Sequence, residues 1–338
     1  MKKLILFLLM LCLPLQVTAE GTAAWLPYWE ASAALEDAEN LAEELDSVIV
    51  FAAVFDQKGK PVLPDGAESL LLRTRHAFAG TNTKVYISIV NDQEKARGGY
   101  QSKSAELIAR LLWNDRALDQ HLDDLLLLLD KSEADGLELD YENFGSNTKL
   151  YARYARLIEK LYAALSADGM GLRVVLNWDA PRYMTLPEGP EYSVMCYNLY
   201  GYHSGPGPKA DTAFLKQVAD LWRDVPGTVR MAFAVGGFLW KGSKVVSALT
   251  QQEAEKLLTE RGVVPTRDAG SGALTATFIH EGGKGTLWYA DGETLKRWQT
   301  QMSEFDGTDL FCLGGADPKD WLRTVFQENA AAEEEKSK

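Results

Sequence analysis

Residues 135–142 read DGLELDYE, and this stretch carries the most information about the fold. Because alternate side chains of a strand share a face, Glu138, Asp140 and Glu142 are expected on one side, with two leucines and a tyrosine on the other. In a closed barrel of parallel strands, the apolar side chains would pack against surrounding helices. The acids would then line the interior and rise toward the C-terminal mouth, where barrel sites are built.

Three carboxyl groups on one strand face are costly to bury in their ionised form. Like charges at this spacing raise the pKa of at least one of them, so that an acid can hold its proton near neutral pH. Glu142 is nearest the expected mouth and is the natural proton donor, while Asp140 and Glu138 could share a proton beneath it. The alternative is that these acids pair with lysines or arginines of the barrel, or face solvent.

Short apolar runs alternate with helical segments along most of the chain. Helical spacing of apolar residues is found, for example, at 115–131, 149–166 and 212–223, with Asp115 as a candidate N-cap. This alternation predicts an α/β fold, a (β/α)₈ TIM barrel, with an open doubly wound sheet as the alternative. The eight expected strands are 23–28, 47–55, 84–90, 136–142, 173–177, 193–197, 229–235 and 309–313.

The connection between the seventh and eighth expected strands is much longer than a usual βα connection. It contains a helical segment at 251–261 and two strand-like runs at 273–279 and 286–289. A further helical segment, 293–303, precedes the last strand. These segments predict a small α+β insertion at about 241–290, on the C-terminal face of the barrel.

The two ends of the chain differ in composition from the middle. Residues 1–19 begin with two lysines, continue with an apolar run at 4–13 and end at a small-residue site, which is typical of a secretory signal peptide. An uncleaved anchor is the alternative. Residues 328–338 are acidic and without periodicity, which predicts a disordered tail. The barrel should therefore occupy 20–327 of an exported protein in the periplasm, the cell envelope or the extracellular space.

Composition narrows the class of partner. The chain has 46% hydrophobic residues and a formal net charge of −13. Such a charge disfavours nucleic acid and anionic lipid, and it suits neutral or cationic substrates. Four scattered histidines offer no metal-site spacing, and no cofactor is expected. Cys196 and Cys312 should be free thiols. We expect a monomer that does not associate with the membrane once the signal peptide is cleaved.

The stretch 135–142 resembles the strand-four signature of glycoside hydrolase family 18, which comprises chitinases and endo-β-N-acetylglucosaminidases. The family pattern is Asp-Gly-x-Asp-x-Asp-x-Glu, in which the last Glu is the acid. Glu138 departs from this pattern, because many members have Asp there and use it to position the next acid. In this chain the residue to be positioned would be Asp140.

Two further segments extend the resemblance over most of the chain. Residues 195–198, MCYN, resemble the strand-six motif Met-x-Tyr-Asp, with Asn198 in place of Asp. Residues 310–315, LFCLGG, resemble the ending of the bacterial spore-germination-type members, with Phe311 where those members have a tryptophan. Trp288 and Tyr289 also fit that subgroup.

The resemblance implies a hydrolase that cleaves β-linked N-acetylglucosamine-containing polymers, either peptidoglycan or chitin-type. It implies a retaining mechanism in which the substrate's own acetamido oxygen is the nucleophile. Glu142 would be the general acid and base, Asp140 would orient the acetamido group, and Tyr197 would donate a hydrogen bond to it. Expected substrate-binding residues, including aromatic platforms at strand ends, are Asp135, Glu138, Met195, Asn198, Tyr28, Trp178 and Phe311.

The alternative is a barrel that binds aminosugar glycans without hydrolysing them. Binding members of this family typically lose the acid, so the presence of Glu142 favours an enzyme. The replacements at Glu138, Asn198 and Phe311 keep the binding alternative open.

Overall fold

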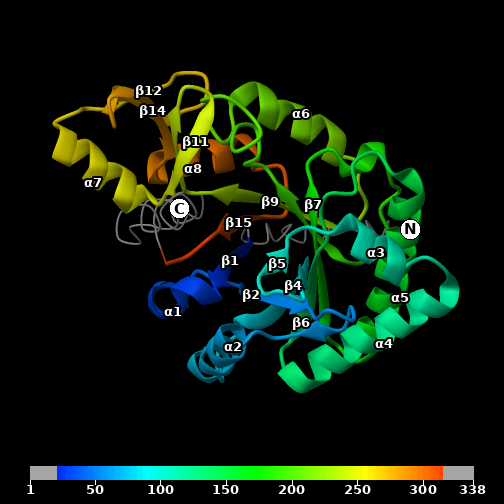
Figure 1. Ribbon diagram of the computed structural model, residues 1–338. Helices are drawn as coiled ribbons and strands as arrows, with labels where there is room; N and C mark the ends of the chain where they lie inside the picture. The colour runs from blue at the N-terminus through cyan, green and yellow to red at the C-terminus, as the bar shows by residue number, and fades with distance from the viewer. Residues whose placement is uncertain (1–20, 315–338) are drawn as a thin grey trace, which may run out of the picture.

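A computed structural model describes residues 21–314 and shows a closed barrel of parallel strands (Figure 1). The barrel closes because β1 pairs with β15 on one side and with β2 on the other, while β2 also pairs with β4. This closure confirms the predicted (β/α)₈ barrel and excludes an open sheet. In order around the barrel, its strands are β1 (Gly21–Pro27), β2 (Ser47–Phe55), β4 (Lys84–Glu94), β6 (Gly136–Asp140), β7 (Gly171–Asn177), β8 (Glu191–Met195), β9 (Thr228–Ala234) and β15 (Gly307–Phe311).

Helices surround the barrel, and the main apolar core lies between them and the strands. Leu137, Leu139 and Tyr141 belong to this outer core, as the alternation of strand-four side chains predicted. The N-cap of α4 is Asn114 rather than Asp115, because the Asn114 side chain accepts the N–H of Ala117. The helices outside the insertion are α1 (Ala31–Asn40), α2 (Asp65–Ala77), α3 (Ala105–Leu111), α4 (Asp115–Ser132), α5 (Thr148–Ala167), α6 (Thr212–Trp222) and α8 (Gly292–Gln301), with short 3₁₀ turns at Tyr28–Glu30 and Ala180–Arg182.

The predicted insertion between the seventh and eighth barrel strands is present as a five-stranded antiparallel sheet with one helix (Figure 1, upper left). It begins at Gly236, directly after β9, which is earlier than the expected 241. A small core of its own joins Leu239, Leu258 and Leu287. Its elements are β10 (Gly236–Lys241), β11 (Lys244–Leu249), α7 (Gln251–Arg261), β12 (Thr266–Arg267), β13 (Leu274–His280) and β14 (Gly283–Ala290).

Several barrel strands end earlier than the sequence predicted, and two of them carry expected catalytic residues. β6 ends at Asp140 and β8 at Met195, so Glu142 and Tyr197 lie in the loops that follow. For Glu142 the reason is a side-chain clamp. Asn91 accepts the N–H of Glu142 and donates to its carbonyl oxygen, both at 3.0 Å, in place of a neighbouring strand.

A short hairpin follows β4 and reaches over the mouth of the barrel. The end of β4 pairs in antiparallel fashion with β5 (Tyr100–Gln101), and β2 pairs similarly with β3 (Pro61–Val62). The chain returns from β5 through Lys103, which has a left-handed φ of 51°. This hairpin brings Lys103 to the same end of the barrel as Glu142.

The signal-peptide prediction for 1–19 and the disordered-tail prediction for 328–338 lie outside the described residues. Among residues 21–314, no helix is long and apolar enough to cross a membrane.

Candidate active site

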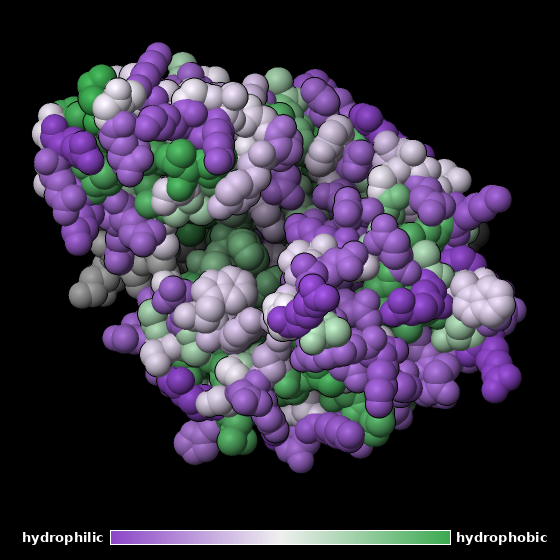
Figure 2. Space-filling model, viewed as in Figure 1, coloured by the Kyte–Doolittle hydropathy of each residue, from purple (hydrophilic) through white to green (hydrophobic). Residues whose placement is uncertain are grey.

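A cavity of about 320 Å³ opens at the C-terminal end of the barrel strands. Figure 2 shows that this face of the molecule is hollowed beside the inserted sheet. Carboxyl, amide and aromatic side chains from β2, β4, β6, β8, β15 and the loops after them converge there. The lining residues are Trp29, Phe51, Val90, Asn91, Asp92, Ser102, Lys103, Asp140, Glu142, Met195, Tyr197, Asn198 and Phe311.

Asp140 lies at the bottom of this cavity and is almost completely buried. Burial raises the pKa of Asp140 well above its usual range, and the charge of Glu142 raises it further, while Lys103 acts in the opposite direction. No hydrogen-bond partner lies within reach of its buried Oδ1 among the described residues. Burial therefore favours the protonated form of Asp140, and its Oδ1 is free to bind a ligand.

Glu142 forms an ion pair whose partner the sequence analysis did not identify. The Lys103 ammonium lies 2.5 Å from Glu142 Oε1. Burial lowers the pKa of Lys103, but the Glu142 carboxylate outweighs this effect and the net shift is upward. The pairing alternative raised from the sequence is thus realised at Glu142, with a lysine supplied by the hairpin after β4.

Two other polar residues near the end of β4 also escaped the sequence analysis. Asn91 is fully buried and fixes the backbone of Glu142, as described above. Asp92 accepts the N–H of Lys103 at 2.8 Å and so fixes the hairpin. The available signal was the pair Asn91-Asp92 directly after the apolar run 84–90, since polar residues at C-terminal strand ends face the mouth of a barrel.

Glu138 lies below the cavity rather than in its lining, in a buried ionic network. Its carboxylate accepts Trp25 Nε1–H at 2.7 Å and pairs with Arg173 Nε at 3.0 Å. Arg173 continues to Asp309 at 2.6 Å, and Asp309 continues to Arg230 at 2.7 Å. Burial raises the pKa of Glu138, with Arg173 opposing. A proton shared between Glu138 and Asp140 is therefore not what the structure shows, because Arg173 and Trp25 occupy the Glu138 oxygens.

Aromatic rings form the wall of the cavity on the β15 side. Tyr197 and Phe311 are stacked, with ring centroids 5.8 Å apart and planes 14° apart. Phe311 also meets Trp25 and Phe51 edge to face, at 5.9 and 5.7 Å. Burial raises the pKa of the Tyr197 phenol well above its usual range, and Asp140 and Glu142 add to this effect. Tyr197 is therefore a neutral hydroxyl that can donate a hydrogen bond into the cavity.

The structure brings together six of the expected site residues at the cavity, namely Glu142, Asp140, Tyr197, Met195, Asn198 and Phe311. Their chemical roles remain predictions. The exposed Asn198 side chain is within 3.7 Å of the Met195 sulfur, so it stands at the rim.

Four expected substrate-binding residues lie outside the cavity lining, namely Glu138, described above, and three more. Asp135 precedes β6 at the opposite, N-terminal end of the barrel, where its carboxylate accepts the N–H of Val85 at 2.8 Å. Trp178 packs edge to face on Phe214 of α6 and is covered by Arg182, at 4.9 Å from the ring centroid. Tyr28 does not line the cavity, whereas its neighbour Trp29 does.

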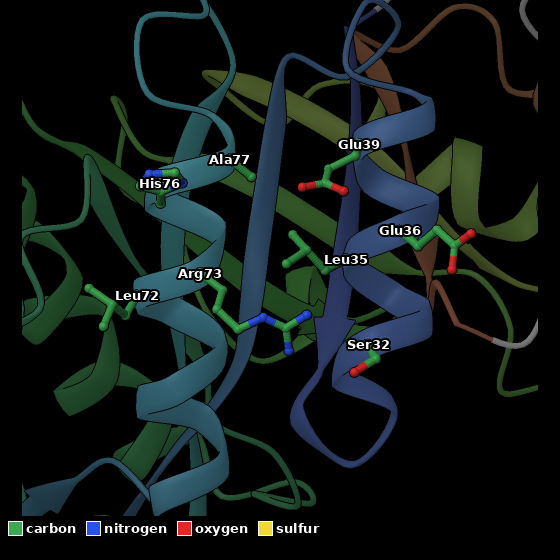
Figure 3. A pocket seen from close by; sticks show the side chains of 8 residues that line it. All are labelled: Ser32, Leu35, Glu36, Glu39, Leu72, Arg73, His76 and Ala77. Atoms are coloured by element: carbon green, nitrogen blue, oxygen red, sulfur yellow. The ribbon is translucent and has the colours of Figure 1, made fainter.

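A larger surface groove lies between α1 and α2 on the outside of the barrel (Figure 3). Glu36 and Glu39 come from α1, and Arg73 and His76 come from α2. No barrel strand contributes to this groove, so we assign the site to the cavity at the mouth. Among residues 21–314, no group of three or more histidine, cysteine or acidic residues could hold a metal ion.

Comparisons with known proteins place this geometry in context. No protein-family model matches the sequence. The chain is 21% identical over 235 residues to the uncharacterized glycosylase YvbX of Bacillus subtilis, covering 64% of this chain and 68% of YvbX. Its fold is similar to that of a chitinase from Chromobacterium violaceum, with a TM-score of 0.74 and 19% identity over 92% of this chain and 99% of that chain. The spore cortex-lytic enzyme SleL of Bacillus cereus gives a TM-score of 0.73 and 16% identity, over 90% of this chain and 73% of that chain.

These comparisons agree with the resemblance to glycoside hydrolase family 18 that was stated from residues 135–142. At such identities the solved structures show that the barrel fold is shared.

Proposed function

We propose that this chain, which resembles glycoside hydrolase family 18 in sequence motifs and in fold, is an exported glycosidase. It cleaves β-linked N-acetylglucosamine-containing polymers of the peptidoglycan or chitin type, with retention of configuration. The observation that carries the proposal is the convergence of Glu142, Asp140 and Tyr197 on one cavity at the mouth of the barrel. A chitinase and a cortex-lytic enzyme with the same fold support it.

The acetamido group of the substrate fits the polar atoms at the bottom of the cavity. The buried Asp140 Oδ1 lacks a hydrogen-bond partner among the described residues, and an amide N–H would supply one. The neutral Tyr197 hydroxyl can donate to the amide oxygen from the side of β8. Held between these groups, the amide oxygen attacks the anomeric carbon and forms a cyclic oxazolinium ion, so no second carboxylate is needed as nucleophile.

Glu142 is the group that handles the proton of the glycosidic bond. It protonates the departing oxygen, and afterwards it removes a proton from the water that opens the oxazolinium ion. In the free protein, the raised pKa of Asp140 favours its protonated form, while Glu142 is paired with Lys103. The chemical step therefore needs a proton on Glu142 and a negative charge on Asp140, which then stabilises the positive oxazolinium nitrogen.

Sugar rings bind through their apolar faces on aromatic platforms. Phe311 stacks with Tyr197 and presents its ring to the cavity, and Trp29 is more than half exposed at the rim. Met195 supplies an apolar contact and Asn198 a polar one on the β8 side. These residues suit a chain of sugars that crosses the mouth above Asp140.

Product analysis tests the proposal directly. Purified protein is incubated with N-acetylglucosamine oligomers and with purified sacculi, and the products are identified by mass spectrometry. Nuclear magnetic resonance of the first product formed shows the anomeric configuration. Shortened oligosaccharides with retained β-configuration are expected. Binding of these glycans without any shortened product would instead establish a glycan-binding barrel.

A further inference from the structure

Lys103 is a charged residue of the cavity to which the proposed reaction gives no role. It is the sole lysine or arginine among the described residues that line the cavity, which otherwise carries Asp92, Asp140 and Glu142. Its side chain is 53% exposed, whereas the Glu142 side chain is 11% exposed. A ligand can therefore reach the ammonium group from the solvent side while Glu142 stays in place.

The backbone of Lys103 is fixed on both sides, which aims its side chain at the mouth. Asp92 accepts its N–H at 2.8 Å, and Asn143 Nδ2 donates to its carbonyl oxygen at 3.3 Å. Asn143 follows Glu142 directly in the chain. The hairpin and the acid-bearing loop are thus tied together, so that the ammonium group and the Glu142 carboxylate keep their relative position.

The ion pair conflicts with acid catalysis in its present form. Lys103 holds Glu142 Oε1, whereas a general acid must present its carboxyl group to the glycosidic oxygen when the substrate binds. A neutral glycan has no carboxylate that could replace Glu142 as the partner of Lys103. A glycan with a carboxylate near the bond to be cleaved could pair with Lys103 instead. Glu142 would then be free to act on the glycosidic oxygen.

We propose that Lys103 is a specificity-determining residue that binds a carboxylate on the substrate sugar next to the cleaved bond and thereby releases Glu142. This inference rests on the proposed function and narrows the substrate class to anionic aminosugar glycans, such as strands with ether-linked lactyl carboxylates. The net charge of −13 does not oppose it, because repulsion between exposed charges is screened beyond about 8 Å at physiological ionic strength. The contact with Lys103 is local.

The second lysine near the mouth does not offer an equivalent contact. Lys209 is partly buried and lines an adjacent cavity between the barrel and the inserted sheet. Its ammonium group donates to the Val235 carbonyl at 2.7 Å and lies 5.5 Å from the centre of the Phe238 ring.

The test compares one glycan in two forms. Peptide-free glycan strands with free lactyl carboxylates are used as such, and a second portion is converted to the neutral methylamide. Hydrolysis and equilibrium binding are measured for the parent protein, Lys103→Met, Lys103→Arg and the control Lys95→Met, which removes an exposed lysine of the same hairpin. Circular dichroism and thermal unfolding confirm that each variant is folded.

The parent should prefer the carboxylate form by about 10- to 100-fold in kcat/KM, the range expected for one charge-assisted hydrogen bond. Lys103→Met should reduce this preference to near unity, while Lys103→Arg and Lys95→Met should keep it. Equal use of both forms by the parent, or an unchanged preference in Lys103→Met, would overturn the inference. If no glycan is hydrolysed, the proposed function fails, and a Lys103-dependent binding preference then still decides the role of Lys103.

Discussion

Arg173→Met should destabilise the protein strongly, and more so at alkaline than at acidic pH. Arg173 is 1% exposed and holds two fully buried carboxylates, Glu138 and Asp309. Asp309 keeps Arg230 after the substitution, but Glu138 keeps uncharged hydrogen-bond donors, such as the indole N–H of Trp25, in place of a cation. Breaking a buried pair by removing one partner costs about 3–5 kcal/mol.

The pH dependence follows from the carboxyl group that is left behind. Burial already raises the pKa of Glu138, and without Arg173 nothing equivalent opposes this effect. A carboxyl whose pKa is higher in the folded than in the unfolded state binds more protons when folded. The variant therefore keeps most stability below the unfolded pKa of about 4.3 and loses about 1.4 kcal/mol per pH unit above it, until Glu138 ionises in the folded state.

Urea unfolding at pH 5 and pH 8, followed by far-ultraviolet circular dichroism, measures both effects. The double variant Glu138→Gln/Arg173→Met replaces the stranded acid by a neutral amide, so it should be more stable than Arg173→Met at pH 8 and should lose the extra pH dependence. A loss below about 1 kcal/mol in Arg173→Met, or a double variant no more stable than the single one, would refute this reasoning.

Three further predictions concern residues around the cavity and in the outer core. Asp140→Asn should lower kcat by at least about 100-fold, because an amide cannot supply the negative charge, and should raise the melting temperature at pH 7, because a buried acid with a raised pKa destabilises the fold there. Asn91→Ala should lower the free energy of unfolding in urea by about 2–3 kcal/mol, because the backbone N–H and C=O of Glu142 lose their partner. It should also lower kcat/KM at least about tenfold, and unchanged kinetics would show that Asn91 does not position the acid. Burial lowers the pKa of His121 to about 3, so the unfolded state binds more protons than the folded state as pH falls below about 6.5. The parent should therefore lose about 2 kcal/mol of stability through His121 between pH 7 and pH 5, and His121→Gln should not show this loss. Urea unfolding at the two pH values measures the difference.

The barrel and the inward acids were predictable because strand periodicity leaves few choices. Leucines alternate with acids in 136–140, and only one face of such a strand can meet the helices. The direction of the same strand could have placed Asp135 at the far end of the barrel, since it precedes the first strand residue. Its assignment to substrate binding followed the resemblance alone, and the structure places it outside the cavity.

The surroundings of Glu142 could not be predicted, because they depend on contacts between distant segments. Gly98 and Gly99 mark the turn of the hairpin, but Lys103 after it has a left-handed φ of 51° with no glycine to mark it. Arg173 could have been noticed as a charged residue in an apolar strand, but its partners Glu138 and Asp309 are set by the closure of the barrel. Which of the acids keeps a proton depends on where Lys103 and Arg173 lie.

The proposed reaction depends most directly on Glu142 as the acid and base. Glu142→Gln keeps the shape of the side chain and removes the transferable proton, so kcat/KM for N-acetylglucosamine oligomers should fall by about 100- to 10,000-fold while the circular dichroism spectrum stays unchanged. A folded Glu142→Gln protein that hydrolyses these oligomers as fast as the parent would contradict the account.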